Sequence, residues 1–79
     1  NPVTNIRYDI PEDGQVSINI YDIMGNRVEE LINRPESAGS KLIQWNAKDE
    51  QGRALSAGIY FYTITANRYN ITKKMVLLK

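Results

Sequence analysis

The sequence predicts an all-β fold, a sandwich of two antiparallel sheets built from about seven short strands. Apolar and polar residues alternate with period two along most of the chain, and clusters of Gly, Pro, Asn and Asp interrupt this alternation at short intervals. No segment combines the length and the capping residues of a helix. With 79 residues, 42% of them hydrophobic, the chain is expected to form a single domain spanning 1–79.

The first two strands are expected at 5–10 and 15–21. In the first, Ile6, Tyr8 and Ile10 alternate with polar residues, and in the second the residues Val16, Ile18 and Ile20 do the same. Each set therefore forms one inward face. The segment 11–14 between them has the Pro and Gly of a tight turn, which predicts that the two strands form a hairpin.

The middle of the chain continues the pattern with more irregular connections. Gly25 supplies the positive φ of a turn at 22–26, after which 27–32 returns as a strand. A helix over 27–33 is the alternative, but it would lack an N-cap and sufficient length. Pro35 and Gly39 predict an irregular loop over 33–40 that crosses between sheets. A short strand at 41–45 then points Ile43 and Trp45 inward.

Three further segments complete the predicted sandwich. The segment 46–53 is a turn that contains Gly52, and 54–55 adds a very short strand. Gly58 then opens the run 59–66, which is apolar on both faces and is therefore expected at the centre of a sheet. After a turn at 67–68, the last strand covers 69–78.

Charge is distributed unevenly along the chain. Residues 1–50 hold nine acidic and five basic side chains, whereas residues 51–79 hold five basic side chains and no acidic one. Either the two parts neutralise each other as neighbouring strands, or the second part faces an anionic partner.

The composition favours a module without chemistry of its own. The chain has no His and no Cys, and it lacks both a nucleophile beside a base and a phosphate-binding loop. The acidic turns 12–14 and 49–52 each offer too few ligands for Ca²⁺, which takes about six to eight oxygens. No apolar run approaches the roughly 20 residues of a membrane span. We therefore expect no enzyme activity, no cofactor, no metal, no nucleic-acid partner and no membrane span, and we expect a monomer.

A series of short motifs follows in a recognisable order along nearly the whole chain. They are Ile6-Arg7-Tyr8-Asp9-Ile10-Pro11, Val16-Ser17-Ile18-Asn19-Ile20-Tyr21-Asp22, Gly25-Asn26-Arg27-Val28, Ala38-Gly39, Trp45-Asn46, Asp49-Glu50-Gln51-Gly52, Ser56-Ala57-Gly58-Ile59-Tyr60-Phe61-Tyr62 and Lys73-Lys74-Met75-Val76-Leu77-Leu78-Lys79. In this order they resemble the type A C-terminal sorting domain of the type IX secretion system. That family is similar in turn to the immunoglobulin-like domain of the flagellar hook-capping protein. The chain departs from the sorting family at Ala47, where Gly is usual after Trp-Asn, which argues against a positive φ there.

The resemblance implies an immunoglobulin-like sandwich and a specific function. It implies a C-terminal secretion signal that directs export and cell-surface attachment of a cargo domain preceding it in the same protein. The implied partners are the translocon, its shuttle and a surface sortase, and the implied location is the outer membrane exterior of Bacteroidetes-type bacteria after transit of the periplasm. The alternatives are a structural spacer or assembly domain like that of the hook cap, or an accessory module of a multidomain secreted enzyme.

Two sets of residues are candidates for a role. Tyr60 resembles the tyrosine corner of immunoglobulin-like sandwiches, in which the hydroxyl binds backbone, and Tyr62 should face the core. Gly25, Trp45, Gly52 and Gly58 are further structural candidates. The competing role for the tyrosines is an exposed aromatic platform made by Tyr60, Tyr62 and Tyr69 with Arg68.

The closing segment is the candidate recognition site, with residues Lys73, Lys74, Met75, Val76, Leu77, Leu78 and Lys79. Alternation would place Lys73, Met75 and Leu77 on one face and Lys74, Val76 and Leu78 on the opposite face. A receptor would then bind both the charges and the edge of the strand. Alternatively, this is a core strand whose lysines discourage edge-to-edge aggregation.

Overall fold

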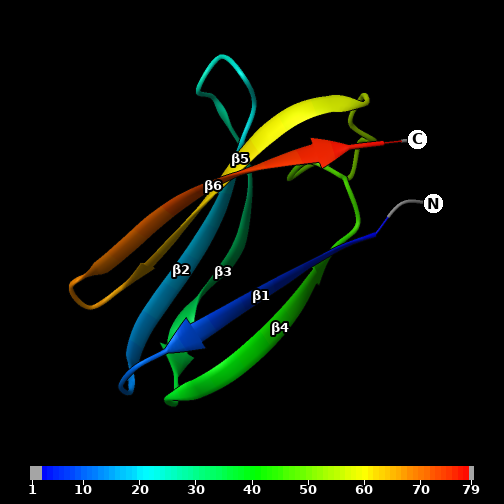
Figure 1. Cartoon of the computed structure of the whole chain (residues 1–79). Helices are drawn as coiled ribbons and strands as arrows, with labels where there is room; N and C mark the ends of the chain where they lie inside the picture. The colour runs from blue at the N-terminus through cyan, green and yellow to red at the C-terminus, as the bar shows by residue number, and fades with distance from the viewer. Residues whose placement is uncertain (1–2, 79) are drawn as a thin grey trace.

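The computed structural model describes residues 3–78, which form six strands in two antiparallel sheets and no helix. The strands are β1 (Thr4–Ile10), β2 (Gly14–Tyr21), β3 (Arg27–Glu36), β4 (Gly39–Trp45), β5 (Gly58–Ala66) and β6 (Tyr69–Leu77). β1 and β4 form one sheet, and the other has the order β3-β2-β5-β6. Figure 1 shows the two layers, with the β2–β3 loop projecting beyond them. The all-β sandwich prediction is confirmed.

The core lies between the two layers and is built from the inward positions of the alternating strands. Ile6, Tyr8 and Ile10 of β1 face Val16, Ile18 and Ile20 of β2, and all six are buried. Trp45, Tyr60, Ile64 and Leu77 complete the centre of the core. Since each sheet buries only one face, period-two alternation was a reliable guide to these strands.

The predicted hairpin between the first two strands is wrong. β1 pairs with β4, whereas β2 pairs with β3 and β5. The bend over residues 11–13 therefore carries the chain from one sheet to the other. Both strands need their apolar faces covered, and in opposite sheets each covers the other across the core.

The predicted loop at 33–40 is also wrong, because β3 continues to Glu36 and β4 begins at Gly39. Pro35 is accommodated because β3 lies at the edge of its sheet, where one side of the strand needs no hydrogen-bond donors. The expected crossing between sheets is confirmed, although it takes only residues 37–38. The helical alternative for 27–33 is excluded, because β3 covers these residues.

The segment between β4 and β5 contains a bridge in place of the expected seventh strand. Lys48 pairs with Ala54 in an isolated antiparallel bridge. The N–H of Leu55 donates to the carbonyl of Ala47, and the N–H of Asp49 donates to that of Arg53, each at 3.0 Å. Ala47 has a φ of 61°, so the expectation against a positive φ there is wrong. Alanine is the L-residue with the smallest side chain, and the turn holds it in this conformation.

Strand β5 occupies the central position predicted for it. It pairs with β2 on one side and with β6 on the other. A two-residue turn at 67–68 joins it to β6, since Ala66 is the partner of Tyr69. Asn67 has the positive φ of this turn. β6 consequently forms one edge of the four-stranded sheet.

Candidate interaction surface

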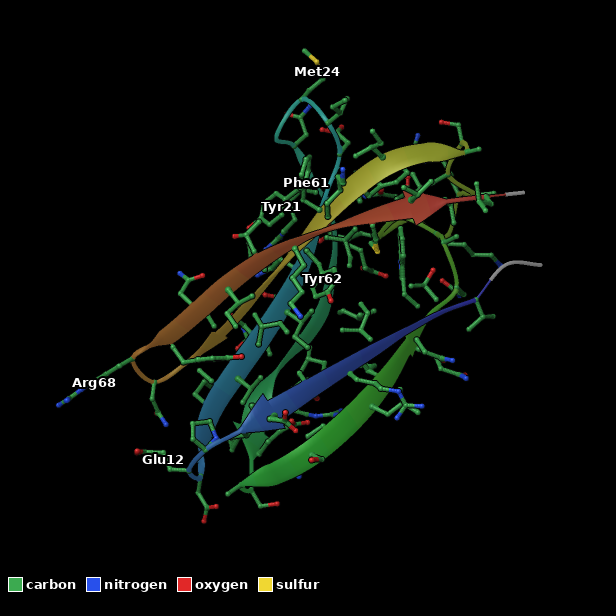
Figure 2. The ribbon with its side chains drawn as sticks, in the orientation of Figure 1. Glu12, Tyr21, Met24, Phe61, Tyr62 and Arg68 are labelled. Carbon is green, nitrogen blue, oxygen red and sulfur yellow. The ribbon has the colours of Figure 1, made fainter. Side chains whose placement is uncertain are left out.

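The β2–β3 loop is held in one conformation by Asp22. The backbone N–H groups of Met24 and Asn26 each donate to Asp22 Oδ1 at 2.9 Å. The N–H of Gly25 donates to the Asp22 carbonyl at 3.0 Å, and Gly25 has a φ of 90°. These bonds satisfy the backbone N–H groups of residues 24–26, while the two apolar side chains of the loop point outward. Ile23 is 67% exposed and Met24 is 81% exposed, the latter at the tip of the loop (Figure 2).

An aromatic pair lies at the base of this loop, on the outer face of the four-stranded sheet. Tyr21 of β2 is the register partner of Phe61 of β5, and Phe61 is in turn the partner of Lys74 of β6. Figure 2 shows the two rings close to the loop. Both residues are half-buried, and both occupy outward positions, since Ile20 and Tyr60 beside them point into the core.

Aliphatic residues extend this surface toward the end of β6. Ile59 of β5 is the partner of Val76, and both are exposed. Leu78, just beyond β6, is 72% exposed. We define the apolar patch as Tyr21, Ile23, Met24, Ile59, Phe61, Val76 and Leu78.

The rest of the outer sheet face is polar. Its cross-strand rows are Asn19–Thr63–Thr72 and Ser17–Thr65–Asn70, and the amide of Gln15 donates to Asn33 Oδ1 at 2.8 Å. Hydroxyl and amide groups on a solvated sheet face are the ordinary arrangement. The apolar residues are thus concentrated at one end of the sheet, the end with the β2–β3 loop.

A groove of about 610 Å³ separates that loop from the segment that enters β5. Its walls include Ile23 and Met24 on one side and Leu55 and Ile59 on the other. Tyr60 forms its base, where the hydroxyl donates to the Ser56 carbonyl at 2.8 Å, as the tyrosine-corner resemblance implies. The ring of Tyr60 meets Trp45 edge to face, with centroids 6.0 Å apart.

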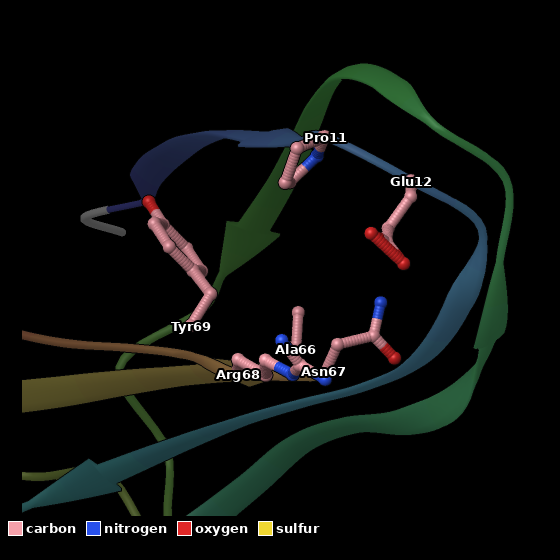
Figure 3. Close-up of a pocket in the computed structure, with 6 residues that line it drawn as sticks. All are labelled: Pro11, Glu12, Ala66, Asn67, Arg68 and Tyr69. Carbon is pink, nitrogen blue, oxygen red and sulfur yellow. The ribbon is translucent and has the colours of Figure 1, made fainter.

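A second groove, of about 660 Å³, lies at the opposite end of the sandwich between the β1–β2 bend and the β5–β6 turn. It is lined by Pro11, Glu12, Ala66, Asn67, Arg68 and Tyr69 (Figure 3). A Cβ at Gly14 would lie 2.5 Å from Asn67 Oδ1, so a glycine there lets the two turns approach closely. The presence of this groove is therefore explained by the way the two turns pack together.

The closing segment forms an exposed edge. β6 is the last strand of its sheet, and Lys73 and Lys74 are exposed on opposite faces. Met75 is half-buried and Leu77 is buried, whereas Val76 is 57% exposed. In the described part of the chain the ion pairs are Arg27–Glu30, Arg27–Glu50, Arg34–Glu36 and Arg53–Asp49, so neither lysine takes part in one. Lys79 lies outside the described residues.

The remaining structural candidates serve turns and the core. Gly25, Gly52 and Gly58 all have positive φ. Trp45 is buried and donates from its indole to the Lys48 carbonyl at 3.1 Å, which ties the turn at 46–55 to β4. Tyr62 and Tyr69 pack partly against the core and Tyr60 is buried, so the three tyrosines do not form an exposed platform.

The apolar patch was not singled out from the sequence. The available signal was the run 59–66, where Ile59 and Phe61 occupy the face opposite Tyr60 and Tyr62. A strand that is apolar on both faces indicates either a covered sheet or a contact surface. Only the structure shows that the second sheet covers just one of those faces.

Two carboxyl groups and two phenol groups have altered pKa values with clear causes. Burial, together with the Tyr8 hydroxyl's bond to Glu36 Oε1 at 2.9 Å, raises the pKa of Tyr8 to about 12. Burial and the neighbouring Glu50 raise the pKa of Glu29. The backbone N–H of Arg53 lowers the pKa of Asp49. Burial also raises the pKa of Tyr62, which packs partly against the core. None of these four residues belongs to the apolar patch.

The described residues contain neither a metal cluster nor a membrane-spanning helix. Among residues 3–78, no three His, Cys, Asp or Glu side chains come together as a metal cluster. Over the same residues, there is no helix with the length and apolarity to cross a membrane.

Comparison with known families identified the family of this chain. The model of the FlgD Ig-like domain matches residues 3–70, which covers most of the chain and ends just inside β6. No curated protein matches the chain.

Comparison with solved structures agrees with the architecture. The crystal structure of FlgD from P. aeruginosa superposes with a TM-score of 0.76 at 24% sequence identity. The match covers 96% of this chain and 61% of the FlgD chain, so this chain spans about three fifths of that protein's length. At this identity the likeness supports the fold.

Proposed function

We propose that this chain, which belongs to the FlgD Ig-like domain family, is a non-catalytic assembly module that connects a larger protein to a partner surface. The observation that carries the proposal is the apolar patch. Apolar side chains gathered on an uncovered end of a sheet are typical of a protein contact site. Aromatic and Met side chains, both present here, are enriched at such contacts.

The construction of the patch also supports an assembly role. Its aromatic members lie on a rigid sheet, and the loop that carries Ile23 and Met24 is fixed by the bonds of Asp22. A preorganised surface loses little conformational entropy on binding. A simple spacer would need neither the uncovered apolar residues nor the fixed loop.

Photo-crosslinking in the parent protein tests this proposal. A benzoylphenylalanine placed at Phe61 should give a discrete crosslinked product in cells, because this side chain lies in the patch. The same residue at Thr65, on the polar half of the same strand, is the matched control and should give none. Equal yields at both positions, or no product at Phe61, would contradict the assembly role and favour a simple spacer.

A second candidate function is favoured by a different observation, the exposed cationic edge of β6. A C-terminal secretion signal of the type IX system would present this edge to the translocon, its shuttle and a surface sortase, and would deliver a preceding cargo to the cell surface. Lys73 and Lys74 are exposed and outside all the ion pairs of the described chain. The family match ends at residue 70, before both lysines.

Export of a reporter tests the second candidate. Residues 1–79 fused to a periplasmic reporter should reach the surface of a bacterium that has this secretion system. The Lys73→Ala/Lys74→Ala variant should lose surface delivery while its melting temperature stays nearly unchanged, since exposed lysines contribute little to stability. Lys41→Ala/Lys48→Ala is the charge-matched control. Retention of a folded fusion in the periplasm would exclude the sorting role.

A further inference from the structure

We infer that the open edge of β6 binds an extended segment of a partner protein by strand addition, and that this segment carries adjacent acidic and adjacent apolar residues. The inference rests on the proposed role as an interaction module and names the partner's chemistry. It concerns β6, whereas the assembly proposal depends on the patch around Phe61.

The backbone of β6 is suited to pairing along its free side. All nine residues pair with β5 in one continuous register. The other edge of the same sheet, β3, has two register shifts against β2 and contains Pro35. Bulges and proline are features that blunt an edge against further pairing. β6 has neither, so its outer backbone groups form a regular template.

The side chains of β6 determine which strand would fit. Lys73 points to the inner face and Lys74 to the outer face, followed by Met75 and Val76 in the same alternation. Residues of an added strand lie directly opposite these four positions. Carboxylates opposite the two lysines and apolar side chains opposite Met75 and Val76 would complement every position. The partner strand therefore has two consecutive acidic residues next to two consecutive apolar residues.

Charge supports an acidic partner over a basic or neutral one. From residue 51 onward the sequence has no acidic side chain. Among the described basic residues after position 50, Arg53 forms an ion pair, and its partner is Asp49. This pair lies far from β6 in the sequence. An incoming carboxylate would thus meet Lys73 and Lys74 without displacing an existing partner.

A second copy of the chain fits this edge poorly. Lys73 is the middle residue of β6, so an antiparallel self-pairing over the whole strand places Lys73 opposite Lys73 of the other copy. Like charges directly opposite each other destabilise a strand pair. The lysines thus act against self-association while remaining available to an acidic strand.

Titration with synthetic peptides tests the inference on the 79-residue chain. Two capped peptides with Thr flanks carry Val-Val-Glu-Glu and Glu-Glu-Val-Val, which suit antiparallel and parallel addition respectively. Backbone amide NMR should show shifts along β6 with at least one peptide at about 1 mM, a concentration that detects a weak dissociation constant of the same order. The Lys73→Glu/Lys74→Glu variant should weaken binding by about tenfold or more, and higher salt should weaken binding to the wild type.

Charge exchange separates recognition from nonspecific attraction. A peptide with Lys in place of Glu should bind the Lys73→Glu/Lys74→Glu variant, and Lys41→Glu/Lys48→Glu should bind the original peptide as the wild type does. Absence of binding, shifts mapped to another strand, or indifference to the double variant would overturn the inference. Dimerisation through β6 without peptide would overturn it as well. If crosslinking at position 61 persists when peptide binding fails, this inference alone is refuted and the assembly proposal stands.

Discussion

Tyr60 connects the core to the segment that enters β5. Its ring is buried against Trp45, while its hydroxyl donates to the Ser56 carbonyl at 2.8 Å. An intramolecular hydrogen bond contributes about 1 kcal/mol net, so this bond both stabilises the bend and positions the base of the groove beside the apolar patch.

Replacing Tyr60 by Phe removes this one hydrogen bond and keeps the packed ring. We expect a loss of about 1 kcal/mol in the free energy of unfolding, which corresponds to a fall of about 4–8 °C in Tm for a domain of this size. Urea unfolding and calorimetry measure both quantities. Tyr62→Phe is the matched control, since the Tyr62 hydroxyl makes no hydrogen bond within the described structure. A larger effect at Tyr62 than at Tyr60 would contradict the assignment.

Tyr8 is a second residue whose hydroxyl has a defined partner. Burial raises its pKa to about 12, with a further contribution from the hydrogen bond to Glu36. A raised phenol pKa means that the folded state favours the neutral form. The resulting stabilisation is complete below the ordinary value of about 10 and is lost as the pH rises through about 12.

Alkaline titration checks this assignment. Phenolate absorbance should show Tyr8 ionising late, together with Tyr62, whose pKa is also raised by burial. Tyr8→Phe should remove one late-ionising group and reduce the loss of stability between pH 10 and 12. Glu36→Gln should bring the Tyr8 pKa only part of the way back, because burial is the larger cause. A complete return to the ordinary value would assign the whole shift to Glu36.

At the scale of elements, the turn at 46–55 shows how one carboxylate organises a connection. Asp49 Oδ1 accepts the backbone N–H groups of Gln51 and Arg53 at 3.0 and 2.9 Å, and Oδ2 accepts the Arg53 Nε at 2.9 Å. The Glu50 N–H then donates to the Val28 carbonyl at 3.0 Å. The turn thereby stays against β3 and covers Trp45.

Asp49→Asn should make the stability of this turn insensitive to acid. The backbone N–H of Arg53 is the main cause of the lowered Asp49 pKa, so the ionised form is favoured in the folded state. The stabilisation is present above the ordinary Asp value of about 4 and is lost as the pH falls through the lower folded value. The Tm of the variant should lie below that of the wild type at neutral pH, and the two should converge in acid. Glu12→Gln, at an exposed position, should leave the acid profile unchanged.

For the whole molecule, the dominant fact is a thin core shared by two sheets. Val16, Ile18 and Ile20 of β2 are completely buried between their own sheet and the sheet that contains β1. A domain of 79 residues has a total stability of roughly 4–12 kcal/mol. The packing of each large core residue is therefore a considerable share of the total.

Ile18→Ala should remove a large share of the stability of the protein. Truncating a fully buried Ile costs about 2–5 kcal/mol, because the cavity adds to the lost transfer free energy. Chemical denaturation with far-ultraviolet circular dichroism measures the change. Thr65→Ala on the exposed face should stay within about 0.5 kcal/mol. Equal costs at the two positions would mean that the core does not lie between the sheets.

Sequence-based prediction was correct where a feature depends on nearby residues and wrong where it depends on distant ones. Val16, Ile18 and Ile20 were placed correctly because alternation is a local property of a half-buried strand. Gly25 was placed in a positive-φ turn for the same kind of reason. Pro35 led to an expected loop because its tolerance at a sheet edge depends on neighbours far along the chain.

The candidate site was only partly visible for a related reason. Lys73 and Lys74 were identified from their unusual position at the end of the chain, and the prediction that they serve recognition stays a prediction. Tyr21 and Phe61 were overlooked because they lie 40 residues apart and become neighbours only through the pairing of β2 with β5.

The sequence alone determined most of the strand segments, the alternating residues that face the core and the positions of the tightest turns, since each depends on neighbours within a few positions. The tertiary structure decided which strands pair, which edge remains open and where apolar side chains stay uncovered. The reason is physical. An alternating strand specifies that one of its faces must be buried, yet any apolar face of suitable length can cover it, so the choice of partner depends on the packing of the entire domain.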